Sequence, residues 1–323
     1  MPFAGCPNRC SFCDQHTITG CINSTTPEQV RESIEIALSS GGILPSESEI
    51  AFFGGSFTAI DRDYMISLLS VALEYTDRFK GIRISTRPDC IDEEVLGIIA
   101  DYRVTAIELG AQSMNDEVLR LNHRGHDSDV VRRASQLIKA HGFSLGLQMM
   151  TGLYGSTDSI DIATAEEFID INPDTVRIYP TVVLEGTELA RLWSEGTYIP
   201  PDADSAADLC ASLIPMFEDA GINIIRVGLH SSETMEQKIV AGAYHPAFRE
   251  LCENRIFLNK TIDTLKQNYI REGEINVFVS PSQVSKLIGQ KKSNLTVLHN
   301  MGYRVRVIPD TTLVHRQIRI EEG

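Results

Sequence analysis

The sequence predicts an α/β protein in which crossover helices connect parallel strands, forming either a barrel or an open doubly wound sheet. Short runs rich in β-branched and apolar residues alternate with longer segments that have helical spacing. Polar residues gather just after these runs, and a compact strand-helix-helix-strand pattern follows near the carboxyl end. The expected strands lie within 49–56, 81–89, 104–113, 143–152, 174–180 and 222–230.

The segments between these runs carry signals for helices. Thr26, Pro27 and Gln29 combine a capping hydroxyl, a first-turn proline and a capping-box partner, so we expect a helix to begin there. Met65 and Leu68 begin an apolar face at helical spacing in the segment between the first two expected strands. The repeated order of strand and then helix is typical of parallel sheets.

Polar side chains lie at or just past the carboxyl ends of five expected strands. In parallel α/β folds, binding and catalytic sites are built at that edge. Turn formation alone would explain such residues after one strand, but it is a strained explanation for five. The residues are Gly54, Gly55, Ser56, Ser85, Thr86, Arg87, Glu108, Gln112, Ser113, Gln148, Arg177 and Tyr179.

Length and composition indicate a folded chain. Its 323 residues suffice for one large α/β domain or a large domain with a small appendage, and 42% hydrophobic with 23% charged residues argue against disorder. No apolar run approaches the length of a membrane span, and the start lacks the basic and apolar regions of a signal peptide. We therefore expect a cytoplasmic protein with no membrane partner.

The net charge is unevenly distributed along the chain. The total of −15 disfavours nucleic acid, because the summed field repels phosphates. From Ile275 to the end, however, seven Lys and Arg residues face three Asp and Glu, so this tail is +4 and the remainder −19. A nucleic-acid surface in the tail and a short tail that is basic by chance are both consistent with this split.

Three cysteines lie within eight residues near the start. Seven cysteines, four of them among the first 21 residues, make a poor disulfide framework and suit free thiolates in a reducing compartment. Structural zinc requires four ligands, whereas an iron–sulfur cluster on Cys6, Cys10 and Cys13 would leave one iron open. Cys21 could supply a fourth ligand, so zinc and a chance cluster remain alternatives at this point.

The segment "CPNRCSFC" resembles the signature of the radical SAM superfamily. There, three such cysteines hold a [4Fe-4S] cluster whose free iron is chelated by S-adenosylmethionine (SAM), and an aromatic residue, here Phe12, precedes the last cysteine. "FFGGSFT" is similar to the glycine motif on the second barrel strand, where the backbone accepts the methionine amine, which implicates Gly54, Gly55 and Ser56. The resemblance implies a partial (β/α)6 TIM-type barrel. It also implies that Cys21 is not a ligand of the cluster.

Three more segments resemble a narrower family. "STRPD" (85–89), "ELGAQS" (108–113) and "HRGH" (123–126) are similar to the radical SAM domain of elongator catalytic subunits and, more distantly, to oxygen-independent coproporphyrinogen oxidases. This implies that Gln112 and Arg124 contact SAM, with the arginine at its carboxylate. Ser85 and Gln148 stand where those oxidases have acidic residues near SAM. "RIYPTVVLEGTELA" and "YHPAFREL" resemble the stand-alone bacterial branch, in which no acetyltransferase domain is expected.

The domain organisation follows from the extent of this resemblance. We expect a partial barrel at 1–250, a helical connection at 251–274 and a small basic module at 275–323. "KLIGQKKSN" resembles the helix, GxxG loop and helix of a KH domain, although Lys292 occupies the second glycine position after Gly289. A small α/β cap with a solvated basic loop is the alternative. Because only Met1–Gly5 precede the cysteines, we expect the first strand to be nearly missing or the amino terminus incomplete.

The resemblance implies an enzyme that cleaves SAM reductively to a 5′-deoxyadenosyl radical, with an RNA substrate such as a tRNA base and an electron donor of the flavodoxin or ferredoxin type. One alternative is a radical SAM enzyme acting on a small molecule, as the porphyrinogen relatives do. Another is a non-catalytic, metal-stabilised RNA-binding protein. Candidates for substrate contact, each of which could instead form buried ion pairs or pack in the core, are Glu108, Arg87, Arg177, Tyr179 and His245.

Overall fold

The structure is a computed structural model that describes residues 6, 9–14, 24–230 and 233–323. The chain divides into two compact units, the first comprising Met1–Asp202 and Met216–Tyr244 and the second comprising Ala203–Pro215 and His245–Gly323. Each unit is described by itself. The expected first strand at residues 1–5 and Cys21 lie outside the described residues.

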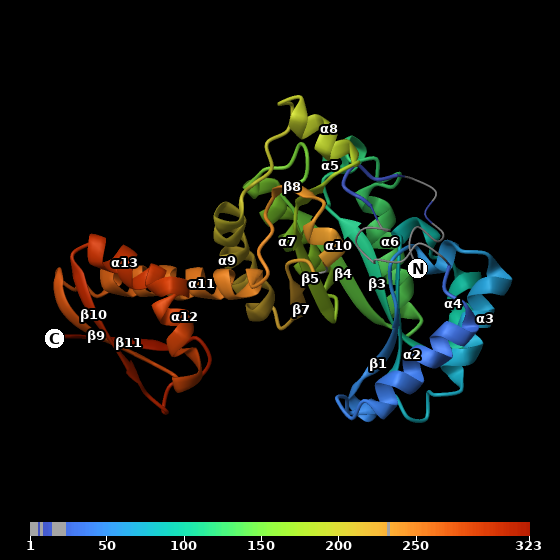
Figure 1. Cartoon of the computed structure of the whole chain (residues 1–323), viewed down its shortest axis with the longest axis horizontal. Coiled ribbons are helices and arrows are strands. Elements are labelled where there is room, and N and C mark those ends of the chain that lie inside the picture. The colour runs from blue at the N-terminus through green and yellow to red at the C-terminus, as the bar shows by residue number, and fades with distance from the viewer. Residues whose placement is uncertain (1–5, 7–8, 15–23, 231–232) are drawn as a thin grey trace. The chain divides into compact units, whose positions relative to one another are not determined.

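The first unit is built on a six-stranded parallel sheet that curls into a half-barrel (Figure 1). Its strands follow one another in chain order, which confirms the predicted partial TIM-type barrel over an open doubly wound sheet. All six expected strands are present. They are β1 (Glu49–Phe52), β2 (Gly81–Thr86), β3 (Val104–Gln112), β4 (Ser144–Thr151), β5 (Thr175–Pro180) and β7 (Asn223–Val227).

Helices connect these strands. The predicted capping box is present, since the Gln29 backbone N–H donates to the Thr26 hydroxyl and the Thr26 N–H donates to the Gln29 side chain. Helices α4, α6 and α7 pack against the central strands β3 and β4. The helices up to residue 236 are α2 (Pro27–Ser39), α3 (Arg62–Leu73), α4 (Glu93–Asp101), α5 (Asp116–Leu121), α6 (Ser128–Ala140), α7 (Asp158–Ile171), α8 (Glu188–Ser194), α9 (Ala203–Asp219) and α10 (Glu233–Glu236).

The central strands are buried on both faces. On β3, Ala106 lies on one face and Ile107 and Leu109 lie on the other, and all three are at most 1% exposed. Apolar runs that are buried on both faces are typical of parallel sheets that helices cover from outside. The side chains that interrupt the runs near the strand ends are therefore the ones available for a site.

A small antiparallel pair, β6 (Val182–Leu184) and β8 (Ile239–Gly242), was not predicted from the sequence. Strands of three or four residues are too short for a periodic pattern. Gly242 has φ +98°, and a Cβ there would lie 2.6 Å from the Thr181 carbonyl oxygen, so only glycine fits. The pair follows β5 in the chain and contributes Val182 and Leu184 to the cavity described below.

The second unit comprises the chain from His245 onward together with Ala203–Pro215. Its three-stranded sheet has the order β10-β9-β11, with β10 parallel and β11 antiparallel to β9. The predicted strand, helix, loop, helix and strand are all present, whereas β11 was not predicted. The elements are α11 (Phe248–Gln267), β9 (Gly273–Val279), α12 (Val284–Ile288), α13 (Ser293–Asn300), β10 (Tyr303–Pro309) and β11 (Ile318–Glu322).

Much of the basic charge of the tail is neutralised within this unit. Arg316 and Lys286 both pair with Glu253, at 2.8 and 3.4 Å, and Arg316 is buried. Arg304 pairs with Glu274, and Arg319 with Asp310 and Glu321. In the described part of the chain, the tail cations without a recorded acidic partner are Lys291, Lys292 and Arg306. The summed charge thus overstates the free basic surface.

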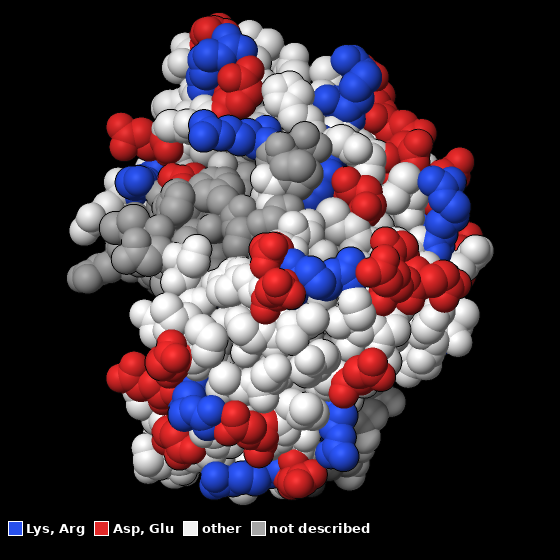
Figure 2. Space-filling view, turned by 90° about the vertical axis from the view of Figure 1, so that its right-hand side faces the viewer, with Lys and Arg blue, Asp and Glu red and all other residues white. Residues whose placement is uncertain are grey.

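The surface of the first unit is mixed in charge. On the face shown in Figure 2, acidic and basic side chains alternate. Exposed ion pairs such as Arg31 with Glu74 and Arg103 with Asp77 belong to this unit. Such a face offers no continuous positive field to a polynucleotide. Among the described residues, no helix is both long and apolar enough to cross a bilayer.

Candidate active site

A cavity of about 360 Å³ opens at the carboxyl ends of the first unit's strands. It is the place at which the sequence predicted a site. Its lining brings together residues from the cysteine loop, from β2 to β5 and from β7. Among the predicted site residues, those that line it are Cys6, Cys10, Phe12, Cys13, Gly54, Gly55, Ser85, Arg87, Gln112, Arg124, Gln148, Arg177 and Tyr179.

The cysteine loop is tied to the half-barrel next to this cavity. The Ser11 hydroxyl donates to Asn122 Oδ1 at 2.6 Å, and the Ser11 backbone N–H donates to the Asn122 carbonyl oxygen. The Leu189 N–H at the start of α8 donates to the Ser11 carbonyl. Both Ser11 and Asn122 are completely buried. These contacts fix the segment that carries Cys10 and Cys13.

Two arginines face the thiols. Burial and the nearby Cys10 raise the pKa of the Cys6 thiol, while the positive charges of Arg87 and Arg124 oppose that rise. A cation favours the charged form of a neighbouring thiol. The loop therefore has compensating positive charge available if its cysteines act as thiolate ligands.

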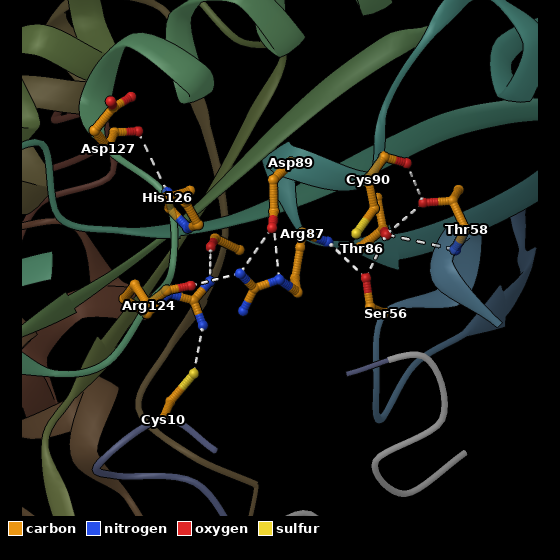
Figure 3. A network of polar contacts seen from close by, with 11 residues as sticks. Cys10, Ser56, Thr58, Thr86, Arg87, Asp89, Cys90, Arg124, His126 and Asp127 are labelled. Carbon is orange, nitrogen blue, oxygen red and sulfur yellow. Dashed lines mark hydrogen bonds and ion pairs between the residues drawn. The ribbon is translucent and has the colours of Figure 1, made fainter. Parts of the chain in front are cut away.

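Arg124 is buried against the cysteine loop (Figure 3). Its Nη1 donates to Cys10 Sγ at 3.1 Å, its Nη2 donates to the Gly110 carbonyl, and its guanidinium lies 5.9 Å from the centre of the Phe12 ring. Its Nε has no hydrogen-bond partner and no exposed surface. A buried donor without a partner costs free energy, so this atom is a candidate to bind a ligand.

Gln112 carries a second unsatisfied group. Its side-chain oxygen is buried without a partner, and its backbone has φ +71°, a left-handed conformation unusual outside glycine. Strain of this kind concentrates at functional sites. A Cβ at Gly110 would lie 3.0 Å from the Gln112 side-chain nitrogen and 3.5 Å from Arg124 Nη2, so the glycine leaves room for both side chains.

A hydroxyl network supports the wall beside β2 (Figure 3). Ser56 and Thr58 both hydrogen-bond to the Thr86 hydroxyl, at 2.9 and 2.7 Å, and the Arg87 backbone N–H donates to Ser56 Oγ. Arg87 itself makes two hydrogen bonds of 2.9 Å to Asp89 and one to the Arg124 carbonyl. Ser56 is completely buried and does not line the cavity, although its backbone interacts with Cys6.

Glu108 lies beneath the cavity rather than in its lining. Arg177 donates two hydrogen bonds to the Glu108 carboxylate, of 2.6 and 2.9 Å, and an Arg83 nitrogen lies 3.5 Å from the same carboxylate. Gln148 donates to it at 2.8 Å and to Ser85 at 3.2 Å. With its oxygens occupied and only 1% of its surface exposed, Glu108 orients the residues above it and is poorly placed to touch a substrate.

The other candidates divide between the two units. Tyr179 lines the cavity beside Arg177, and burial is the main cause that raises the pKa of its hydroxyl, which keeps it a donor. His245 belongs to the second unit, where its Nδ1 accepts the Ala247 N–H. Sequence reasoning missed Met150, Arg226 and His230 in the lining. Arg226 lies in the middle of the expected strand 222–230, whereas the observed strand β7 ends at Val227, so the sequence did not place Arg226 at a strand end.

The chemistry of the cavity lining is compatible with an iron–sulfur cluster. Nowhere in the described ranges do three His, Cys, Asp or Glu side chains converge closely enough for one ion. Cluster thiolates bind different iron atoms and therefore stand farther apart than the ligands of one ion. The three thiols share one cavity with four arginines and with the unsatisfied Gln112 and Arg124 atoms, which fits a bound cluster and a polar ligand beside it.

Comparison with known proteins defines the class. The sequence profile described as the Radical SAM superfamily matches residues 1–168, and that of the Radical_SAM C-terminal domain matches residues 173–257. The chain belongs to the radical SAM superfamily. Its members use a [4Fe-4S] cluster and SAM, so the chain is a SAM-dependent enzyme.

Within this superfamily the chain is similar to elongator catalytic subunits, as predicted. It is 30% identical to the tRNA uridine(34) acetyltransferase of Methanocaldococcus infernus over 56% of this chain and 38% of the relative. It is 30% identical to Elongator complex protein 3 of Dictyostelium discoideum over 73% of this chain and 46% of the relative. The chain thus spans less than half the length of these two curated relatives.

Solved structures agree with this placement. The Methanocaldococcus infernus Elp3 with an N-terminal deletion superimposes with a TM-score of 0.62 at 25% identity, over 76% of this chain and 62% of that chain. The SAM-bound SuiB of Streptococcus suis gives 0.50 at 14% identity, over 72% of this chain and 47% of that chain, which shows the shared fold alone.

Proposed function

We propose that Cys6, Cys10 and Cys13 hold a [4Fe-4S] cluster, and that SAM binds beside it to initiate radical modification of a nucleotide in RNA. The unsatisfied Arg124 Nε and Gln112 oxygen carry the SAM part of the proposal, since both are buried in the cavity that the cysteines line. When bound, the cluster and SAM supply the radical chemistry.

The chain's own residues position and shield this chemistry. Arg124 would direct its free Nε to the SAM carboxylate while it stays anchored on Gly110. Gly54, with φ +103°, and Gly55 would let the backbone approach the methionine amine. Phe12, Phe53 and Met150 line the cavity with apolar surface, which excludes water from a reactive intermediate.

The RNA substrate is supported by the relatives and by the second unit. Three curated relatives are named for tRNA uridine 34. The loop between α12 and α13 presents Lys291 and Lys292, both exposed and both with left-handed backbone, next to Gly289 with φ +78°. Exposed lysines on such a loop suit phosphate contact. An electron donor of the flavodoxin or ferredoxin type would complete the system.

We place the enzyme in the cytoplasm. Cys6, Cys10, Cys90 and Cys252 are free thiols in the structure. Free cysteines persist in reducing compartments.

Metal analysis tests the ligand assignment. After anaerobic reconstitution, we expect about four iron per chain. Alanine at Cys6, Cys10 or Cys13 should abolish cluster assembly, whereas Cys21→Ala, the matched control, should leave the iron content unchanged. Zinc without iron would instead favour a metal-stabilised RNA-binding protein, and a cluster that survives Cys13→Ala would refute the assignment.

A further inference from the structure

The cavity carries positive charge beyond what the proposed cofactors need. Four arginines and one histidine line the cavity, and no Asp or Glu is among the described residues that line it. This stands out in a chain whose net charge is −15. A cluster held by three thiolates and a bound SAM have opposite net charges and largely offset each other. The cluster and SAM together therefore do not neutralise the positive charge of the lining arginines.

Three of the four arginines are already compensated. Arg87 pairs with Asp89, and Arg177 pairs with Glu108. Arg124 lies against Cys10, one of the proposed cluster ligands. Each of these guanidinium groups thus faces either a carboxylate or a thiol that would be a thiolate when it binds the proposed cluster.

Arg226 is the exception. Its Nε donates to the Gly228 carbonyl at 3.1 Å, and its Nη2 lies 3.2 Å from His230 Nδ1. Neither partner is an acid. The residue is half-buried, so its charge is partly removed from water without an anion to replace the hydration.

Arg226 and Arg177 stand side by side on neighbouring strands. They are register partners of the parallel pair β7 and β5, and side chains paired in this way share one face of the sheet. Tyr179 follows on the same face two residues after Arg177 and lies within electrostatic range of both arginines. Two adjacent guanidinium groups, a single acid beneath them and a phenol donor make a site that gains stability from an added anion.

Because Arg226 is the uncompensated cation of this cavity, we propose that Arg226, with the Tyr179 hydroxyl beside it, binds a phosphate group of the substrate nucleotide. Arginine presents two parallel N–H donors that match two phosphate oxygens. The base or sugar of the same nucleotide would then face the SAM that is bound beside the cysteines. This inference rests on the proposed function and adds the orientation in which the substrate nucleotide would bind in the cavity.

The phosphate site can be tested without turnover by calorimetric titration, in which the ligand is added to the reconstituted protein that already contains SAM. Uridine 5′-monophosphate should bind roughly ten- to a hundredfold more tightly than uridine, the gain expected for charged hydrogen bonds. Arg226→Gln should erase this preference, and Arg226→Lys should retain part of it. Arg191→Gln, which alters an exposed arginine on α8 outside the cavity lining, is the matched control and should change nothing.

A short single-stranded RNA, the trinucleotide UUU, distinguishes an RNA phosphodiester from a free nucleotide. Dependence on Arg226 for either ligand supports the phosphate site, and the larger effect identifies the source. Equal affinity for uridine and its monophosphate, no measurable binding of the monophosphate, or a preference that survives Arg226→Gln would overturn it. Failure of the proposed function would appear differently, as absence of 5′-deoxyadenosine in the same preparation.

Discussion

Replacing Glu108 by glutamine removes the buried negative charge on which the floor of the cavity depends. Arg177 would lose two charged hydrogen bonds, of 2.6 and 2.9 Å. At about 1.5–3 kcal/mol for each such bond, the gross loss is roughly 3–6 kcal/mol. The amide oxygen of glutamine retains one acceptor, and Arg83 keeps its 2.7 Å contact with Glu49. We therefore expect Glu108→Gln to lower the free energy of unfolding by about 3 kcal/mol.

Urea denaturation followed by tryptophan fluorescence measures this change, because the only tryptophan of the chain, Trp193, lies on α8 in the same unit. Glu117→Gln is the matched control. Glu117 pairs with Arg120 at 2.6 Å with both side chains more than half exposed, so its loss should cost less than about 1 kcal/mol. A comparably small loss for Glu108→Gln would refute the structural role assigned to Glu108.

Two further predictions concern groups remote from the cysteines. Burial raises the pKa of Asp161 to about 6, so the stability that Asp161 contributes should fall by at most about 3 kcal/mol as the pH rises from about 4 to 6. Asp161→Asn should flatten the plot of unfolding free energy against pH over this range. An unchanged slope would contradict the raised pKa of Asp161. In filter binding to single-stranded RNA, replacing Lys291 and Lys292 with glutamine should reduce the slope of log affinity against log salt by about 1.4, or about 0.7 for each lost phosphate contact. The control Arg304→Gln removes an arginine paired with Glu274 and should change the slope less, while equal changes would argue against the loop.

The fold was largely readable from the sequence because parallel strands have strong local signals. Each strand of the half-barrel carries a short run rich in β-branched and apolar residues, and the Thr26 capping box marks a helix start through neighbouring residues alone. The β6–β8 pair and β11 escaped prediction. Their stability comes from partners distant in the chain, such as β9 for β11, and short strands have no periodicity of their own.

The site was predictable to the extent that it follows strand ends. Gln112 and Arg177 were found because the carboxyl edge of a parallel sheet is a general location for sites. The sequence left open whether Glu108 contacts substrate or forms a buried ion pair, since its burial under Arg177 and Gln148 depends on three strands meeting. The ion pairs that neutralise the basic tail, such as Arg316 with Glu253, also join residues far apart in sequence, so a charge count could not reveal them.

The most direct test of the central claim is the release of 5′-deoxyadenosine from SAM by the reduced, reconstituted protein under anaerobic conditions. We expect the nucleoside to form with the wild-type chain and with Cys21→Ala, to be absent with Cys10→Ala, and to form faster when tRNA is added. Stimulation by a small metabolite but not by tRNA would redirect the substrate assignment. Absence of 5′-deoxyadenosine from a preparation with a full complement of iron and sulfide would contradict the proposed reaction.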